Sequence, residues 1–153
     1  GDASRKIIEV MSDIVWTINP KNDTFENIIS RMSTLAYNLL KAKNIEHTFQ
    51  ADESLDETKL SLESRRNFYL IFKETLNNLV KYSQATRASI TLTSENALIK
   101  LAIRDNGIGF DVAQTSKGNG LLNMKARAEE MKAQLKIESV KGSGTNIELI
   151  FKA

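Results

Sequence analysis

The 153-residue sequence contains no cysteine and a single histidine, His47. These absences exclude a disulfide framework, a thiolate zinc site and a cluster of histidine ligands. The absence of cysteine also leaves no Cys-His nucleophile pair. No apolar run approaches the ~20 residues that a membrane-spanning helix needs, and no signal peptide opens the chain.

Proline and glycine are scarce and unevenly placed. The only proline is Pro20, and six of the seven glycines lie between Gly107 and Gly144. We therefore expect regular structure in the first two thirds, and a ligand near the glycines, where the backbone can approach it closely. The formal net charge is only +2, with both signs interspersed, so we expect no nucleic-acid partner.

Hydrophobic periodicity predicts an α/β fold. Apolar residues spaced three and four apart predict helices over 5–18, 25–43, 62–83 and 121–132. Alternation predicts strands over 45–50, 89–93, 98–104, 135–139 and 145–151. We expect an acidic solvated loop at 52–57 and a glycine-bearing loop at 105–120. The predicted architecture is a two-layer α/β sandwich, with a mixed sheet of about five strands on about three helices and an N-terminal helical extension.

One face of the predicted third helix carries a polar stripe. At ~100° per residue, Glu74, Asn78 and Lys81 fall within an arc of about 60°. Carboxylate and amide oxygens suit Mg²⁺, and an ammonium suits a phosphate. A solvated helix face gives the same pattern, so the stripe alone does not establish a site.

Two strand ends place polar side chains on the buried side of the predicted sheet. Asp105 continues the apolar series that includes Ile103, so its carboxylate needs a hydrogen-bond donor such as an adenine amino group. Capping a turn in Asp-Asn-Gly is an equally good explanation of this residue. Thr145 has the same parity in the last strand, where a β-branched residue is ordinary.

The glycine pair at 118–120 precedes a predicted helix. Its backbone N–H groups and the helix N-terminus predict an anion site, although a plain loop-to-helix transition has the same appearance. The sequence contains neither G-x-x-x-x-G-K-[ST] nor G-x-G-x-x-G, which sets aside the P-loop and Rossmann interpretations.

Four segments, in this order, resemble the nucleotide-binding boxes of sensor histidine kinases. Residues 74–83 are similar to the N box, 105–110 to the G1 box D-x-G-x-G-F, 118–128 to the G2 box, and 142–145 to the closing G-x-G-T. The family is the histidine-kinase branch of the ATPases that include gyrase and the ninety-kilodalton heat-shock chaperone, which share the Bergerat fold. The resemblance covers residues 24–153 and implies ATP and Mg²⁺ as cofactors.

The resemblance assigns the adenine and the metal to particular residues. It implies that Asp105 accepts a hydrogen bond from the adenine amino group, with Thr145 close to the same edge. It implies that Asn78 ligates Mg²⁺ and that Glu74, the catalytic residue, orients Asn78 or polarises the attacking group. Lys81 would contact phosphate.

Further nucleotide contacts follow from the same resemblance. Tyr82 would lie along the nucleotide, and Leu121 would join the binding site. Gly107 and Gly109 would give room for the base and sugar. Residues 110–118 would form a short ATP lid, hinged at Gly118 and Gly120.

The N-terminal segment resembles a different part of the kinases. Residues 5–20 look like the tail of the second dimerisation helix in kinases paired with helix-turn-helix response regulators. We therefore expect a partial dimerisation helix at 1–20 and a catalytic ATP-binding domain at 21–153, excised from a longer protein. The phosphoacceptor histidine would lie on the missing dimerisation domain, and His47 would be structural. The chain alone should not phosphorylate itself.

The resemblance also implies partners and a location. The partners would be the dimerisation domain of the same protein and the receiver domain of a response regulator. The domain would be cytoplasmic, and its parent would be a homodimer for which an anchor in the inner membrane is one expected arrangement. Two alternatives remain open: a serine kinase of the same superfamily resembling an anti-sigma factor, and a nucleotide-sensing module without turnover.

Overall fold

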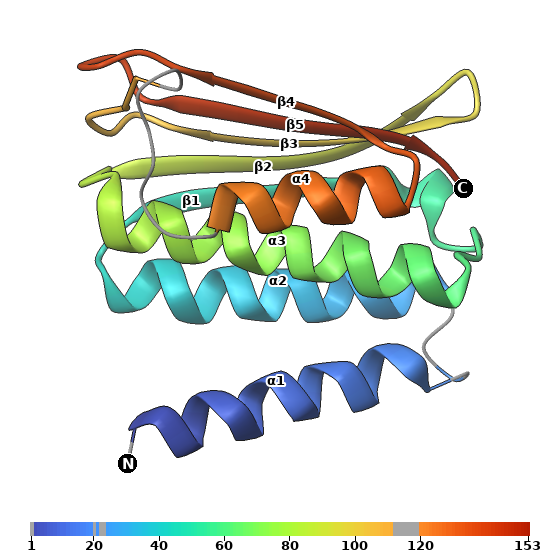
Figure 1. Cartoon of the computed structure of the whole chain (residues 1–153). Coiled ribbons are helices and arrows are strands. Elements are labelled where there is room, and N and C mark those ends of the chain that lie inside the picture. The colour runs from blue at the N-terminus through green and yellow to red at the C-terminus, as the bar shows by residue number, and fades with distance from the viewer. Residues whose placement is uncertain (1, 20, 22–23, 112–119) are drawn as a thin grey trace.

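The computed structural model describes residues 2–19, 21, 24–111 and 120–153. Its helices are α1 (Asp2–Ile18), α2 (Phe25–Ala42), α3 (Leu62–Tyr82) and α4 (Gly120–Glu130), with a 3₁₀ turn η2 (Glu53–Leu55). Its strands are β1 (Glu46–Ala51), β2 (Arg87–Glu95), β3 (Leu98–Asp105), β4 (Gln134–Ser139) and β5 (Thr145–Lys152). Figure 1 shows the sheet covering a layer formed by α2, α3 and α4, with α1 beneath that layer. The predicted sandwich with a helical extension is confirmed.

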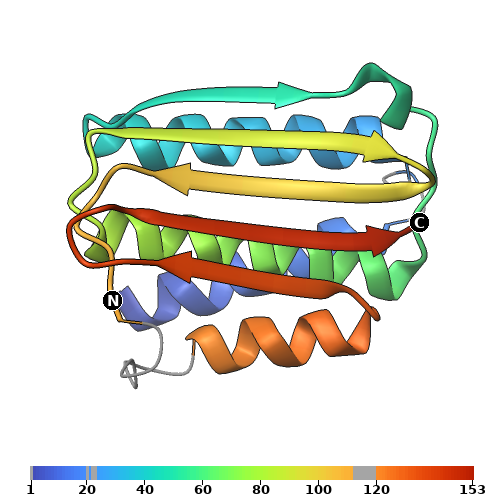
Figure 2. The ribbon, with the colours of Figure 1, turned by 90° about the horizontal axis from the view of Figure 1, so that it is seen from above.

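Within the described residues the strands form one five-stranded sheet in the order β1-β2-β3-β5-β4 (Figure 2). Strands β1 and β2 are parallel, and the other neighbours are antiparallel. Parallel neighbours need a crossover connection, and α3 supplies it. This crossover places α3 against the middle of the sheet, between α2 and α4.

The helix-facing side of the sheet is organised as rows of side chains that run across the strands. The register aligns one apolar row: Phe49, Ile90, Ile103, Ile147 and Ile137. The last row on this side, here called the end row, is different in character: His47, Ala88, Asp105, Thr145 and Ser139. The buried face of the sheet therefore becomes polar at the edge where β3 ends and β5 begins.

Helix α3 supplies the centre of the core. Phe68, Phe72 and Leu76 are fully buried between the sheet and the neighbouring helices. The Phe68 ring packs edge-on against Phe25 of α2, at 5.6 Å between centroids. It also packs in a tilted arrangement against Phe151 of β5, at 5.3 Å between centroids. These contacts join α2, α3 and the sheet, which fixes the position of α3 relative to the end row.

The segment 52–57 is exposed or half-exposed at every residue except Leu55, as predicted for a solvated loop, but it contains a turn that its composition does not show. The Asp52 carboxylate accepts a hydrogen bond from the backbone N–H of Ser54 at 2.9 Å, which begins the turn η2. This turn directs Leu55 into the core, where it is 2% exposed. The acidic composition predicted the exposure of this segment, whereas the capping aspartate and the buried leucine are features that composition does not predict.

Helix α1 docks on the helix layer through one buried carboxylate. Asp13 is 6% exposed and pairs with Arg31 of α2 at 2.6 Å and with Lys73 of α3. The Arg31 guanidinium also lies over the rings of Trp16, at 4.7 Å, and Tyr69, at 5.4 Å. A buried carboxylate needs such partners, so the pairing defines where α1 sits.

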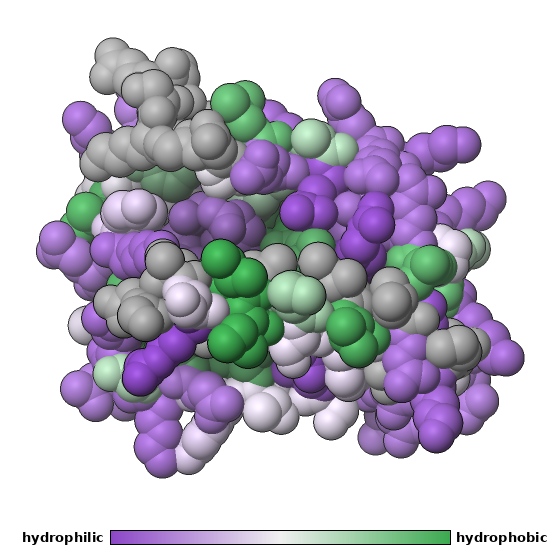
Figure 3. Space-filling model, turned by 60° about the horizontal axis from the view of Figure 1, so that its bottom comes forward, coloured by the Kyte–Doolittle hydropathy of each residue, from purple (hydrophilic) through white to green (hydrophobic). Residues whose placement is uncertain are grey.

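The opposite face of α1 is apolar and exposed. Figure 3, which views the molecule from the α1 side, shows apolar side chains gathered there. They are Ile7, Ile8, Met11 and Val15, each more than 60% exposed. No helix among the described residues combines the length and the apolar character required to cross a membrane.

We predict that Asp13→Ala releases α1 while the sheet and its helices stay folded. The variant loses charge-assisted hydrogen bonds worth about 1.5–3 kcal/mol and leaves two cations without their partner. The measurement is hydrogen exchange of the α1 amides, together with fluorescence of Trp16, the only tryptophan. Glu129→Ala, at an exposed position on α4, is the control. Unchanged α1 protection in Asp13→Ala would contradict this account of the docking.

Candidate functional site

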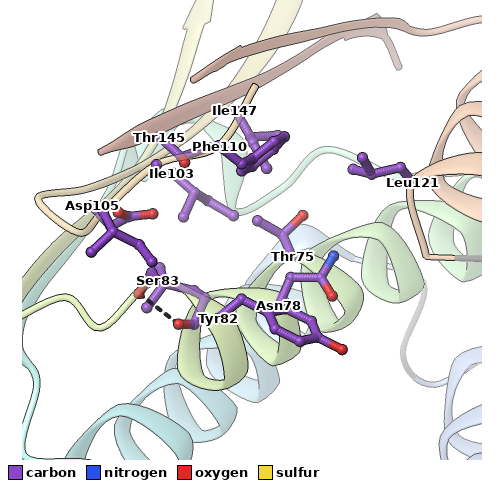
Figure 4. A pocket seen from close by; sticks show the side chains of 13 residues that line it. Thr75, Asn78, Tyr82, Ser83, Ile103, Asp105, Phe110, Leu121, Thr145 and Ile147 are labelled. Carbon is purple, nitrogen blue, oxygen red and sulfur yellow. Dashed lines mark hydrogen bonds between the residues drawn. The ribbon is translucent and has the colours of Figure 1, made fainter. Parts of the chain in front are cut away.

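A cavity opens between α3 and the polar end of the sheet, and it holds about 870 Å³ of open space, part of it continuous with solvent. Its lining comes from α3, β3, β5, the loop after β3 and the start of α4: Thr75, Asn78, Leu79, Tyr82, Ser83, Ile103, Asp105, Ile108, Gly109, Phe110, Leu121, Thr145 and Ile147. In Figure 4, Asp105 and Leu121 lie at opposite ends of this lining.

Asp105 is the ionisable group at the closed, sheet end of the cavity. Its Oδ1 accepts a hydrogen bond from the Gly107 N–H at 2.8 Å, so the residue caps the turn and also lines the cavity. Burial raises the pKa of the Asp105 carboxyl above its ordinary value, although hydrogen bonds from the Gly107 and Thr145 backbones oppose the rise. A further hydrogen-bond donor would therefore stabilise this partly buried carboxylate.

Thr145 lies beside Asp105 because the two are cross-strand partners in the end row. Its hydroxyl is 2.8 Å from the Ser139 hydroxyl, the next member of that row. Below them, Ile103 and Ile147 of the adjacent row form an apolar wall. A flat ligand with a polar edge matches this combination of surfaces.

The α3 side of the cavity is less polar than its sequence suggests. The Thr75 hydroxyl donates to the Ile71 carbonyl at 2.8 Å, and the Ser83 hydroxyl donates to the Leu79 carbonyl at 2.6 Å. Both hydroxyl protons are therefore used inside the helix. Figure 4 shows Thr75 and Asn78 extending from α3 toward the sheet, and Asn78 keeps its amide for other partners.

Glu74, Asn78 and Gly120 meet where α4 begins. A Cβ atom added to Gly120 would lie 2.3 Å from Glu74 Oε1 and 3.4 Å from Asn78 Nδ2. The missing side chain thus lets the first turn of α4 approach a carboxylate and an amide on α3. No three histidine, aspartate or glutamate side chains converge to hold a metal in the described part of the chain, so a cation here would need ligands from a bound molecule or water.

Gly107 and Gly109 permit close packing within the protein. A Cβ atom on Gly107 would lie 2.1 Å from the Ser83 carbonyl oxygen, and one on Gly109 would lie 2.1 Å from the Val140 carbonyl oxygen. Gly109 also has a φ of +64°, which an L residue adopts only with strain. These glycines hold the turn after β3 against α3 and the β4–β5 hairpin. Gly109 lines the cavity as well.

The structure brings most of the predicted site residues to one place. Six of them line the cavity: Asn78, Tyr82, Asp105, Gly109, Leu121 and Thr145. Four others are not among the lining residues: Glu74, Lys81, Gly107 and Gly120. Gly118 and residues 112–118 of the predicted lid lie outside the described residues. Tyr82 is 55% exposed, so it lies at the mouth of the cavity.

Several lining residues were not among those predicted for the site. They are Thr75, Leu79, Ser83, Ile103, Ile108 and Ile147, whereas Phe110 was predicted only as the first residue of the lid. The parity of Ile103 and Ile147 with Asp105 and Thr145 is a signal for two of them, whereas Thr75 resembles an ordinary core position. His47 belongs to the end row but is not among the lining residues, and its ring packs 6.4 Å from that of Tyr37.

Comparison with known proteins identifies the family. Residues 63–153, more than half of the chain, match the family described as histidine kinase-, DNA gyrase B- and HSP90-like ATPases. The chain belongs to this ATPase family. The match includes the residues that line the cavity and the four segments on which the predicted resemblance rested: 74–83, 105–110, 118–128 and 142–145.

Curated relatives of this ATPase domain are sensor kinases. The chain is 32% identical over 96 residues to the sensor histidine kinase LiaS of Bacillus subtilis, covering 62% of this chain and 27% of LiaS. It is 37% identical over 93 residues to the sensor histidine kinase ComP of the same organism, covering 59% of this chain and 12% of ComP. The chain therefore spans about a quarter or less of these relatives.

Solved structures show the same fold at low sequence identity. The Acinetobacter baumannii histidine kinase AdeS superposes with a TM-score of 0.70 at 14% identity, over 99% of this chain and 79% of that one. The catalytic domain of the histidine kinase ThkA gives a TM-score of 0.68 at 13% identity, over 84% of this chain and 93% of that one. These likenesses confirm the predicted α/β fold of the ATPase domain.

We predict that Asp105→Asn gains stability relative to the parent as the pH rises. Burial raises the pKa of Asp105 in the folded protein. The protonated carboxyl therefore contributes stability to the parent at pH values below the ordinary pKa of about 4. This stability is lost as the pH rises through the raised pKa. The asparagine variant has no such loss. The measurement is the free energy of urea unfolding of both proteins between about pH 3.5 and 7.

Asp52→Asn is the control with the opposite sign. The Ser54 N–H lowers the pKa of Asp52, so the parent gains stability above the ordinary pKa and loses it as the pH falls. This variant should therefore lose stability relative to the parent as the pH rises. The same direction of change in both variants would refute the environment assigned to Asp105.

Proposed function

We propose that this chain is the ATP-binding catalytic domain of a sensor histidine kinase and that its cavity holds the adenine of ATP. The observation that carries the proposal is that Asp105 and Thr145 lie side by side at one end of a mostly apolar cavity. The adenine amino group would donate to the carboxylate, and the ring would lie between the α3 side chains and the isoleucines of the sheet. Guanine would present a carbonyl oxygen to the same carboxylate, which repels it.

The phosphates and Mg²⁺ belong, in this proposal, at the end of the cavity where α3 meets α4. Asn78 would offer its amide oxygen to the metal, and Glu74 would orient Asn78 or the attacking group. Mg²⁺ usually takes few protein ligands beside phosphates and water, which suits one amide next to one carboxylate. When bound, the ion neutralises phosphate charge. Lys81 and the start of α4 at Gly120 would attract the phosphates, and Tyr82 and Leu121 would flank the nucleotide.

The domain would position the γ-phosphate for a histidine on the dimerisation domain of its parent protein. Such a transfer depends on placement and charge stabilisation more than on covalent chemistry by the domain itself. His47 does not line the cavity and packs against Tyr37, which supports an acceptor elsewhere. The likeness to the sensor histidine kinases LiaS and ComP supports a parent that passes phosphate to a response regulator. In this proposal the parent is a homodimer and the domain acts on the cytoplasmic side.

We predict that Asp105→Asn weakens ATP and ADP binding roughly ten- to a hundredfold, because a hydrogen bond to a charged acceptor is worth ~1.5–3 kcal/mol. Calorimetric titration of the purified chain is the measurement, and GTP should bind weakly to parent and variant alike. A melting curve checks that the variant is folded. Equal ATP affinity in parent and variant would overturn the adenine assignment.

Asn78→Ala is the matched control at the other end of the cavity. It should leave adenosine binding unchanged, because Asp105 and Thr145 hold the base, and it should remove the dependence of ATP binding on Mg²⁺. Titrations with and without Mg²⁺ separate the two effects. A variant that keeps the parental Mg²⁺ dependence would show that Asn78 does not hold the metal.

A further inference from the structure

Ser139 is a hydrogen-bonding centre behind the cavity, and the site described so far gives it no role. Its hydroxyl accepts a hydrogen bond from the backbone N–H of Phe110 at 2.8 Å, from the loop that follows β3. The same hydroxyl lies 2.8 Å from the Thr145 hydroxyl and 3.3 Å from the Gly144 carbonyl oxygen. Ser139 thus joins the end of β4, the start of β5 and the loop after β3.

A count of protons shows that two arrangements are possible. The Ser139 hydroxyl has one proton, and it donates either to Thr145 or to the Gly144 carbonyl. If it donates to Thr145, the Thr145 proton is available to the cavity. If Thr145 donates to Ser139 instead, Thr145 presents only lone pairs. The first arrangement uses the shorter contact, 2.8 Å against 3.3 Å.

The first arrangement is also a chain of donors in one direction. It runs from the Phe110 N–H to Ser139, from Ser139 to Thr145, and from Thr145 into the cavity. Successive hydrogen bonds of this kind polarise and strengthen one another. Phe110 donates from the backbone and cannot reverse, so the chain has a fixed first step.

We propose that Ser139 is a positioning residue, which turns the Thr145 hydroxyl into a donor aimed at the ring nitrogen beside the amino group of the bound base. The inference rests on the proposed function and deepens it. Asp105 and Thr145 are adjacent in the end row, so a base whose amino group meets Asp105 presents its neighbouring ring atom to Thr145. In adenine that atom is an acceptor, whereas in guanine it carries a proton.

The test compares ADP with 1-deaza-ADP, which has carbon in place of that ring nitrogen. Calorimetry of the parent, Ser139→Ala, Thr145→Val and the double variant gives the affinity for each nucleotide. Ser143→Ala is the matched control, because Ser143 is an exposed serine in the same β4–β5 hairpin. In Ser139→Ala, ADP affinity should fall roughly three- to tenfold, the effect of one neutral hydrogen bond. Its affinity for 1-deaza-ADP should change less than twofold, and Ser143→Ala should match the parent.

The Thr145→Val background separates positioning from general structural damage. There, adding Ser139→Ala should change ADP affinity by less than twofold, because the hydroxyl that Ser139 orients is absent. An equal loss of both nucleotides in Ser139→Ala, or no loss of either, would overturn the role of Ser139 while leaving the ATP site in place. A parent that binds neither nucleotide would overturn the proposed function itself.

Discussion

The geometry of the site depends on one carboxylate placed at the end of a buried, apolar sheet face. Asp105 continues the parity of Ile103, so the register that builds the core also carries a charge to its edge. The cost of that placement is reduced by the N–H groups of Gly107 and Thr145, but burial still raises the pKa of the carboxyl. A buried carboxylate is costly to leave without a hydrogen-bond donor, so this position suits a ligand that donates a hydrogen bond to Asp105. In this way the fold is linked to nucleotide binding.

Helix α3 connects the docking site of α1 with the cavity. Tyr69 and Lys73 contact the α1 side, where Asp13 and Arg31 complete the docking. One position later Glu74 lies at Gly120, and Thr75 and Asn78 line the cavity on the sheet side. Because α3 is packed through Phe68 and Phe72 into the core, the α1 docking site and the cavity share a single rigid element.

The sequence alone was sufficient for the sheet face and much of the candidate site. Strand parity predicted the inward placement of Asp105 and Thr145, and helical spacing predicted Glu74 and Asn78 together. The cap at Asp52 is a local contact with Ser54, and the role of Ser139 depends on contacts between segments; hydrophobic periodicity has no signal for either. The packing of Gly107 on the Ser83 carbonyl is likewise visible only once α3 and the loop after β3 are placed. The structure shows that Asp105 caps a turn, which is one of the two explanations that the sequence left open, and that it also lines the cavity.

The central claim is that the edge of an adenine base lies against Asp105 and Thr145. Backbone NMR of the chain during titration with ADP and Mg²⁺ tests this claim most directly. The largest chemical-shift changes are expected at the backbone amides of Gly107 and Thr145, which flank the carboxylate. The chemical shifts of the α1 amides should change little. Titration with GDP should leave the first two amides nearly unchanged. Shift changes concentrated on α1 or on the solvent-facing side of the sheet would contradict the account.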